Sequence, residues 1–268
     1  MKGRGLATYA VAYLLFLYAP VILLPLFAFN DGTIIAFPLQ GFTTGWFVQL
    51  TRIEALHDSV FNSLWIALTT AVLSTCFGLF AARASARYRF PAKGGIMGLI
   101  MLPLVLPEII VAVALLVVLL QLGIDLGAWT VILGHVLICT PFSIAILNSA
   151  FLSLDESLEE ASYDLGETKW STFRLITLPL VMPGIISSML IAFTISLDEF
   201  IIAFFLTGNE PTLPVYLWSQ LRFPTKIPIV MALGTIMLVA SLLLLTAAEY
   251  FRRRGVARTG AKDSGGFL

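Results

Sequence analysis

The sequence predicts an all-α membrane protein with six transmembrane helices and with its N and C termini in the cytoplasm. Of the 268 residues, 59% are hydrophobic and only 12% are charged, whereas soluble domains are about half apolar and about a quarter charged. A soluble domain of this length cannot bury so much apolar surface. The 16 basic and 16 acidic residues cancel, so no excess of positive charge indicates a nucleic-acid partner.

Six apolar stretches are long enough to cross a bilayer, which takes about 20 consecutive apolar residues. They lie at roughly 9–29, 59–82, 95–120, 128–151, 178–206 and 227–250. The first stretch is too long for the apolar part of a signal peptide, and no small-residue cleavage site follows it, so we expect a retained span. Pro103 and Pro107 each remove a helix hydrogen bond, so the third span is expected to be kinked or broken.

The orientation follows from the basic residues, which concentrate in cytoplasmic segments. One side of the predicted membrane carries Lys2, Arg4, Arg83, Arg87, Arg89, Lys93, Lys169, Arg174, Arg252, Arg253, Arg254, Arg258 and Lys262. The other side carries only Arg52, Arg222 and Lys226. Six spans with both ends inside satisfy this bias. We expect one membrane domain, residues 1–254, followed by a disordered cytoplasmic tail, residues 255–268.

The sequence contains no pattern that indicates catalysis or a metal site. Cys76 and Cys139 lie inside apolar stretches, which argues against a disulfide framework or a metal cluster. No G-x-x-x-x-G-K-[ST], H-E-x-x-H or G-x-S-x-G motif occurs. His57 and His135 are isolated, and a histidine in an apolar helix is more often a packed polar residue than a ligand. We expect neither an enzyme nor a resident cofactor.

The predicted cytoplasmic loop, residues 152–177, is polar and helical in character. Asp155 or Ser153 can cap a helix that Gly166 then ends, and a second helical stretch leads from Thr168 to Ile176. A helix lying on anionic lipid carries lysine and arginine on its polar face. This one is acidic instead, so a protein partner in the cytoplasm fits better than the membrane surface. Its acidic residues are Asp155, Glu156, Glu159, Glu160, Asp164 and Glu167.

This loop resembles the EAA loop of the permeases of ABC importers. The resemblance is carried by Glu160-Ala161-Ser162, Gly166, Ile176 and Leu178-Pro179 at the family's spacing, with Ser162 in place of alanine. It implies a MetI-like type I importer core in which the loop forms a coupling helix that docks on a cytoplasmic ATPase. ATP and Mg²⁺ are then bound by the ATPase subunits and not by this chain. The residues implied to serve this coupling are Glu159, Glu160, Ala161, Ser162, Asp164, Gly166, Leu178 and Pro179.

Nearly the whole chain is also similar to the PotC-type permeases of spermidine/putrescine importers. The segments that carry this closer likeness are Gly41-Phe42-Thr43-Thr44 with Trp46, Leu122-Gly123-Ile124 with Leu126-Gly127 and Trp129, Ser196 to Phe200, Thr207-Gly208 and Leu213-Pro214. The resemblance implies a multi-pass protein of the bacterial inner membrane that imports polyamines. It also implies three kinds of partner: a homologous second permease, a dimer of ATP-binding subunits, and a periplasmic or extracellular polyamine-binding protein.

Three ionisable side chains fall inside the predicted spans, where a charge costs about 2.5–3.5 kcal/mol and is a functional candidate by default. They are Glu108, Asp198 and Glu199, and no lysine or arginine lies well inside any span. Unpaired carboxylates favour a pathway for a cation, although each acid could instead hydrogen-bond a neighbouring helix. Ser196 and Trp46 are further candidates, Trp46 through cation–π contact or simply as an interfacial aromatic residue.

Two other transport functions stay open at this point. A permease of the same type could carry another small solute, such as an amino acid derivative or a ferric ion. A proton-coupled secondary carrier could use the same acids as a proton relay, but it leaves the pattern of the cytoplasmic loop unexplained. A membrane-embedded enzyme is disfavoured, because the sequence lacks any nucleophile–base or metal pattern.

Overall fold

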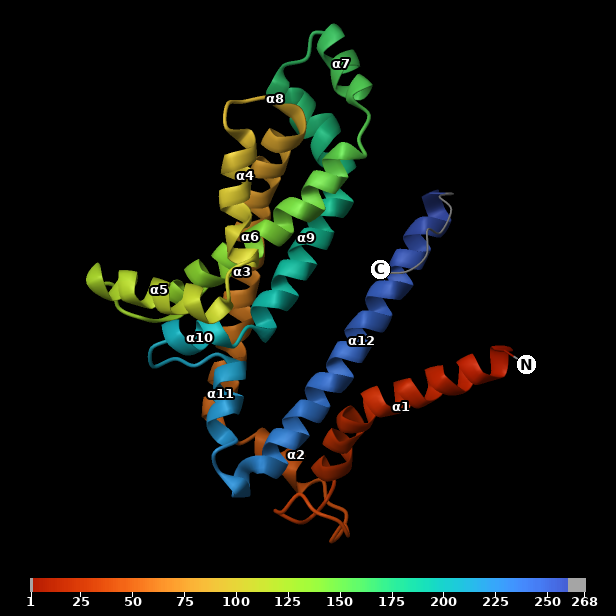
Figure 1. Cartoon of the computed structure of the whole chain (residues 1–268), viewed down its shortest axis with the longest axis vertical. Coiled ribbons are helices and arrows are strands. Elements are labelled where there is room, and N and C mark those ends of the chain that lie inside the picture. Colours follow the sequence, from red (N-terminus) through yellow and green to blue (C-terminus); the bar gives the residue numbers. More distant parts are fainter. Residues whose placement is uncertain (1, 260–268) are drawn as a thin grey trace. The chain divides into compact units, whose positions relative to one another are not determined.

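The computed structural model describes residues 2–259, which are helical with irregular connections (Figure 1). Within these residues there is no β-strand, and one isolated antiparallel bridge joins Asn30 and Phe42. The chain divides into two compact units. One consists of Met1–Glu54 with Leu217–Leu268, and the other of Ala55–Tyr216. The predicted all-α class is therefore confirmed.

The first unit joins the two ends of the chain. Its helices are α1 (Lys2–Ala28), α2 (Gly45–Leu50), the short 3₁₀ helix η3 (Pro224–Lys226) and α12 (Ile227–Thr259). Helix α12 packs against both α1 and α2. The expected tail is helical from residue 255 through Thr259, and residues 260–268 lie outside the described part of the chain.

The second unit contains the remaining helices, and the last of them continues from Leu217 into the first unit. They are α3 (Glu54–Arg87), α4 (Lys93–Met101), η1 (Leu102–Leu104), α5 (Glu108–Gln121), α6 (Ala128–Leu152), α7 (Glu156–Asp164), α8 (Lys169–Thr172), the π-helical turn η2 (Phe173–Thr177), α9 (Leu178–Asp198), α10 (Ile201–Leu206) and α11 (Leu213–Gln220). The pair α6 and α9 forms its centre, and α10 packs on α5 and α6 (Figure 1). Buried apolar side chains such as Ile66, Ile138 and Ile202 fill the space between these helices.

Two predicted spans are interrupted. The third is broken as the prolines predicted: α4 with η1 and α5 are bent by 100° across residues 105–107. The fifth was predicted as one helix over 178–206, and this is wrong. Helix α9 ends at Asp198, Glu199 is extended (φ −69°, ψ 121°), and α10 begins at Ile201. The residues after the break are as apolar as those before it, so the hydropathy pattern did not reveal it.

Four described helices are long and apolar enough to cross a membrane, and the bent α4–α5 pair raises the number to as many as five. The four are Gly5–Ala28, Glu54–Arg87, Ala128–Leu152 and Lys169–Asp198. A shorter apolar helical stretch runs over Pro224–Ala240. The structure thus describes a multi-pass membrane protein.

The close approach of α3 to α6 depends on Gly78. A Cβ at this position would lie 2.6 Å from the Ser143 Cβ and 3.0 Å from the Ser143 carbonyl carbon. Because part of this obstacle is backbone, Gly78→Val is expected to lower the free energy of unfolding by about 1–3 kcal/mol through overpacking. The measurement is the melting temperature of the purified protein in detergent. Gly98→Val is the matched control, because nothing lies within 4 Å of its Cβ position, and an equal loss in both variants would contradict the prediction.

Candidate functional site

Helix α7 begins with a side-chain cap and a concentration of negative charge. The Asp155 carboxylate accepts a hydrogen bond from the Ser157 backbone amide at 3.0 Å, which confirms Asp155 as the cap and lowers the pKa of its carboxyl group. Glu156 and Glu159 lie in the first turn. Acids at this end are favourable because the N-terminus of a helix carries a partial positive charge.

Arg87, at the end of α3, holds α7 in place. Its guanidinium lies 2.8 Å from the Glu156 carboxylate and 3.2 Å from the Glu159 carboxylate. It also donates a hydrogen bond to the Leu154 carbonyl oxygen at 3.1 Å. The side chains of Arg87 and Glu159 are each only 10% exposed, whereas that of Glu156 is 67% exposed. The contact to Glu159 is therefore a buried ion pair, and the contact to Glu156 is a surface one.

The inner face of α7 is bound to the helix that follows. Thr177 donates a hydrogen bond to Glu159 at 2.6 Å, and the hydroxyl groups of Ser162 and Thr172 are 2.9 Å apart. Glu159 and Ser162 are buried by these contacts. The structure thus places these two predicted coupling residues in the base of the loop, where they hold its shape.

The other predicted coupling residues lie on the outer face of α7 and in the segments that follow it. Glu160, Ala161 and Asp164 are exposed, as are Gly166 and Pro179, while Leu178 is half-buried. Leu165 adds an apolar side chain that is 86% exposed. Carboxylates around an exposed leucine offer a surface for a partner protein. The sequence did not predict a role for Leu165, because a single leucine in a polar loop forms no pattern.

Gly166 turns the chain between α7 and α8. Its φ of +88° is left-handed. Its amide donates a hydrogen bond to the Tyr163 carbonyl oxygen at 2.9 Å, and the Glu167 amide donates one to the Ser162 carbonyl oxygen at 3.1 Å. These bonds satisfy carbonyl groups at the end of α7, as a left-handed glycine does at many helix ends. The prediction that Gly166 ends this helix is confirmed.

If this loop docks on an ATPase, as its resemblance to the EAA loop implies, Gly166→Val is expected to reduce ATP-driven uptake about five- to thirtyfold, because a left-handed conformation costs an L-residue about 1–2 kcal/mol. Nothing lies within 4 Å of the added Cβ, so the effect is one of backbone strain and not of collision. Uptake and co-purification of the ATPase are the measurements. Gly95→Val, in the first turn of α4 with equally open surroundings, is the matched control. Normal uptake by the Gly166 variant would contradict a docking role for this turn.

Two arginines of α3 were missed as parts of this site. From the sequence, Arg83 and Arg87 were interpreted only as positive charges on the cytoplasmic side of the predicted membrane. The structure places the Arg83 guanidinium 4.1 Å from the centre of the Phe173 ring, and Arg87 against α7 as described. One signal was available: residues four apart on a helix lie on the same face, and this face is followed by an acidic loop.

The adjacent acids Asp198 and Glu199 differ completely in their surroundings. Glu199 is buried, and its carboxylate accepts a hydrogen bond from the Ile202 amide at 2.9 Å, at the start of α10. Asp198 is the last residue of α9 and is exposed, with no hydrogen bond or ion pair to the described residues. Glu199 is thus satisfied within the fold, whereas Asp198 is free to meet a solute.

The remaining pathway candidates are distributed over the two units. Glu108 is exposed in the first turn of α5. Ser196 is buried, with its hydroxyl 2.7 Å from the His135 Nδ1, so His135 is a packed polar residue as predicted. Trp46 belongs to the first unit, where its ring is half-buried and its Nε1 donates to the Asn30 carbonyl oxygen at 2.8 Å. Among the described residues, no group of three or more histidine, cysteine or acidic side chains is placed to hold a metal ion.

Comparison with known proteins identifies relatives of nearly the same length. The spermidine/putrescine transport system permease protein PotC of Shigella flexneri is 33% identical over 268 residues and aligns with 99% of each chain. The putrescine transport system permease protein PotI of Escherichia coli (strain K12) is 36% identical over 258 residues and aligns with 91% of each chain.

Solved structures share the fold at low sequence identity. A chain of a bacterial alginate ABC transporter, solved in complex with an alginate pentasaccharide-bound periplasmic protein, is similar with a TM-score of 0.74 at 20% identity over 94% of each chain. The MetNI methionine ABC transporter gives a TM-score of 0.61 at 18% identity, over 80% of this chain and 99% of that one. The predicted fold of an ABC-importer permease is therefore confirmed. Since the model of the family described as binding-protein-dependent transport system inner membrane component also matches residues 74–255, the chain belongs to this family of transport subunits.

Proposed function

We propose that this chain is one of two homologous membrane subunits of an ATP-driven importer for polyamines such as spermidine and putrescine. The observation that carries the proposal is the alignment with PotC and PotI over nearly the whole chain at 33% and 36% identity. Its partners are a second permease that completes a heterodimer, a dimer of ATP-binding subunits that hold ATP and Mg²⁺, and a polyamine-binding protein outside the cell.

The proposed topology has six spans, with both termini in the cytoplasm of a bacterial inner membrane. It combines the long apolar helices with the asymmetric distribution of lysine and arginine. In this orientation α7 and α8 face the cytoplasm, where Glu160, Asp164 and Leu165 meet the ATPase. Asp198 lies at the opposite end of the continuous helical stretch that begins at Lys169.

The mechanism we propose is alternating access. Closure of the ATPase dimer on ATP shifts α7, and the ion pairs of Arg87 with Glu156 and Glu159 transmit this shift to α3. The polyamine leaves its binding protein and enters a path that includes Glu108 and Asp198, whose carboxylates attract its ammonium groups. Hydrolysis of ATP then restores the inward-facing state. This chain supplies part of the path and the contact to the motor.

The test is uptake of labelled spermidine by proteoliposomes that contain the complete transporter. We expect uptake that requires ATP, the ATPase subunits and the external binding protein, and that unlabelled putrescine inhibits. Uptake driven by a pH gradient without ATPase subunits would instead indicate a secondary carrier. ATP-driven uptake of an amino acid derivative or ferric ion, unaffected by polyamines, would keep the transporter class and overturn the proposed cargo.

A further inference from the structure

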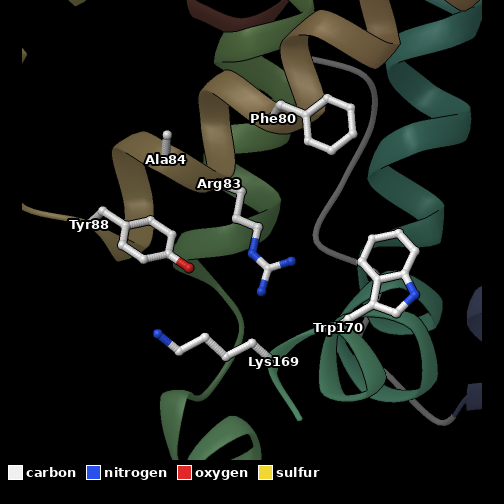
Figure 2. A pocket seen from close by; sticks show the side chains of 6 residues that line it. All are labelled: Phe80, Arg83, Ala84, Tyr88, Lys169 and Trp170. Carbon is white, nitrogen blue, oxygen red and sulfur yellow. The ribbon is translucent and has the colours of Figure 1, made fainter.

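A cavity of about 380 Å³ lies between the end of α3 and the start of α8. It is lined by Phe80, Arg83, Ala84, Tyr88, Lys169 and Trp170. In Figure 2 the Tyr88 hydroxyl, the Arg83 guanidinium and the Lys169 side chain lie around one space, and the rings of Phe80 and Trp170 lie on the other side of Arg83. The lining thus combines two cations and a hydroxyl group with two aromatic walls.

The charge of this cavity is not cancelled by its own walls. No acidic residue lines it, and neither Arg83 nor Lys169 forms an ion pair within the described residues. The Arg83 Nε is buried and also lacks a hydrogen-bond partner there. Stacking on Phe173 nevertheless fixes the guanidinium. Arg83, Tyr88 and Lys169 also line an adjoining cavity that contains three acids. Two of these acids, Glu156 and Glu159, are paired with Arg87, so Glu160 is, in the described part of the chain, the one unpaired carboxylate beside the two cations.

The polarity of the lining changes along α3. Phe80 is 59% exposed, although it precedes the end of the helix at Arg87 by two turns, or about 10 Å at 1.5 Å per residue. Arg83 lies one turn further along, and Tyr88 follows the end of the helix. Because α3 is a candidate membrane span, this order runs from the hydrocarbon region to the membrane–water boundary, where tryptophan and tyrosine are enriched.

We propose that this cavity binds the phosphate group of an anionic phospholipid, with the acyl chains lying along Phe80. Arg83 supplies a planar set of donors that matches a phosphate, and Lys169 supplies a point charge. We favour a lipid over the docked ATPase as the occupant, because Phe80 falls inside the predicted span 59–82, where an exposed ring meets acyl chains and not a cytoplasmic protein. Bound lipid then links α3 to α8 beside the coupling loop.

The test uses the assembled transporter, purified with equal amounts of phosphatidylglycerol and phosphatidylcholine, with bound lipids counted by native mass spectrometry. We expect the wild type to retain phosphatidylglycerol selectively. Lys169→Gln removes a positive charge that forms no ion pair within the described residues, and Arg83→Gln removes the other one. Each variant is expected to retain phosphatidylglycerol about fivefold more weakly. Arg174→Gln, an exposed basic residue outside the cavity, is the matched control. The readout needs neither ATP nor polyamine, so it does not depend on the proposed cargo.

Several results would overturn the proposal. Unchanged retention in Lys169→Gln would do so even if Arg83→Gln fails to assemble. An equal loss in Arg174→Gln would indicate diffuse surface charge, and an equal loss of both lipids would indicate an apolar groove. Displacement of phosphatidylglycerol by millimolar inorganic phosphate would point to a free anion as the ligand. A photo-crosslinker attached to Trp170→Cys should label lipid, and labelling of the ATPase would assign the cavity to that partner.

Discussion

Arg87→Ala is expected to lower ATP-driven uptake about tenfold or more in the assembled transporter. The substitution removes the ion pairs that hold α7 against α3 and leaves the Glu159 carboxylate buried with only the Thr177 hydroxyl group as partner. Removal of one partner from a buried ion pair typically costs about 3–5 kcal/mol. Because every 1.4 kcal/mol is a factor of ten, about half of this loss, if it appears as weaker docking of the ATPase, is enough to produce a tenfold effect.

The matched comparison for Arg87→Ala is Glu156→Gln, which removes only the exposed half of the same ion-pair network. Exposed pairs contribute about 0.2–1 kcal/mol, so uptake should fall at most about fivefold. Arg87→Lys should lie between the two, because an ammonium group keeps the charge but lacks the fork that reaches both carboxylates and the Leu154 carbonyl oxygen. Uptake and co-purification of the ATPase are measured together. Equal behaviour of Arg87→Ala and Glu156→Gln would refute the role of the buried pair.

The double variant Glu108→Gln, Asp198→Asn is expected to raise the KM for spermidine-stimulated ATP hydrolysis about tenfold or more. Hydrogen bonds to charged groups contribute about 1.5–3 kcal/mol, and the amides that replace these carboxylates cannot attract the ammonium groups of the cargo. Both side chains are exposed, so the exchange of carboxylate for amide leaves the packing intact. A KM equal to that of the wild type would remove the cation pathway from the mechanism.

Glu199→Ala separates this effect from a structural one. The Glu199 carboxylate accepts a hydrogen bond from the amide of Ile202, and a hydrogen bond to a charged group contributes about 1.5–3 kcal/mol. We therefore expect a lower melting temperature and an unchanged KM for spermidine. If Glu199→Ala raised the KM as strongly as the double variant, the division between a solute-binding Asp198 and a structural Glu199 would be wrong.

Much of the fold could be predicted from the apolar composition of the sequence and from the prolines and glycines that interrupt or end its helices. The apolar stretches predicted the long helices, because only a lipid environment accommodates them. Pro103 and Pro107 predicted the break in the third span, since proline acts through local geometry. The end of α7 at Gly166 was predicted for the same reason. In contrast, the break at Glu199 depends on where this side chain is buried. Residues 201–206 are apolar, and an apolar segment fits a continuous helix as well as a broken one.

The candidate site was predictable only in part. The coupling loop was located by its acidic composition and its spacing, but its division into an inner and an outer face depends on contacts distant in sequence. Arg87 and Glu156 are 69 residues apart, and Thr75 and Ser188, whose hydroxyl groups are 3.1 Å apart between α3 and α9, are separated by 113. Asp198 and Glu199 have the same chemistry and adjacent positions, so only the fold distinguishes the free acid from the buried one.

The uninterrupted helical stretch from Lys169 to Asp198 has a mechanical consequence. Its 30 residues form a rod about 45 Å long at 1.5 Å per residue, stiff compared with the turns at either end. If one end were the pivot, a tilt of about 10° would carry the other end through about 8 Å over that length, more than the diameter of an extended aliphatic amine. In the mechanism we propose, a small tilt beside the ATPase would therefore become a larger displacement at the other end of this helical stretch, where Asp198 lies.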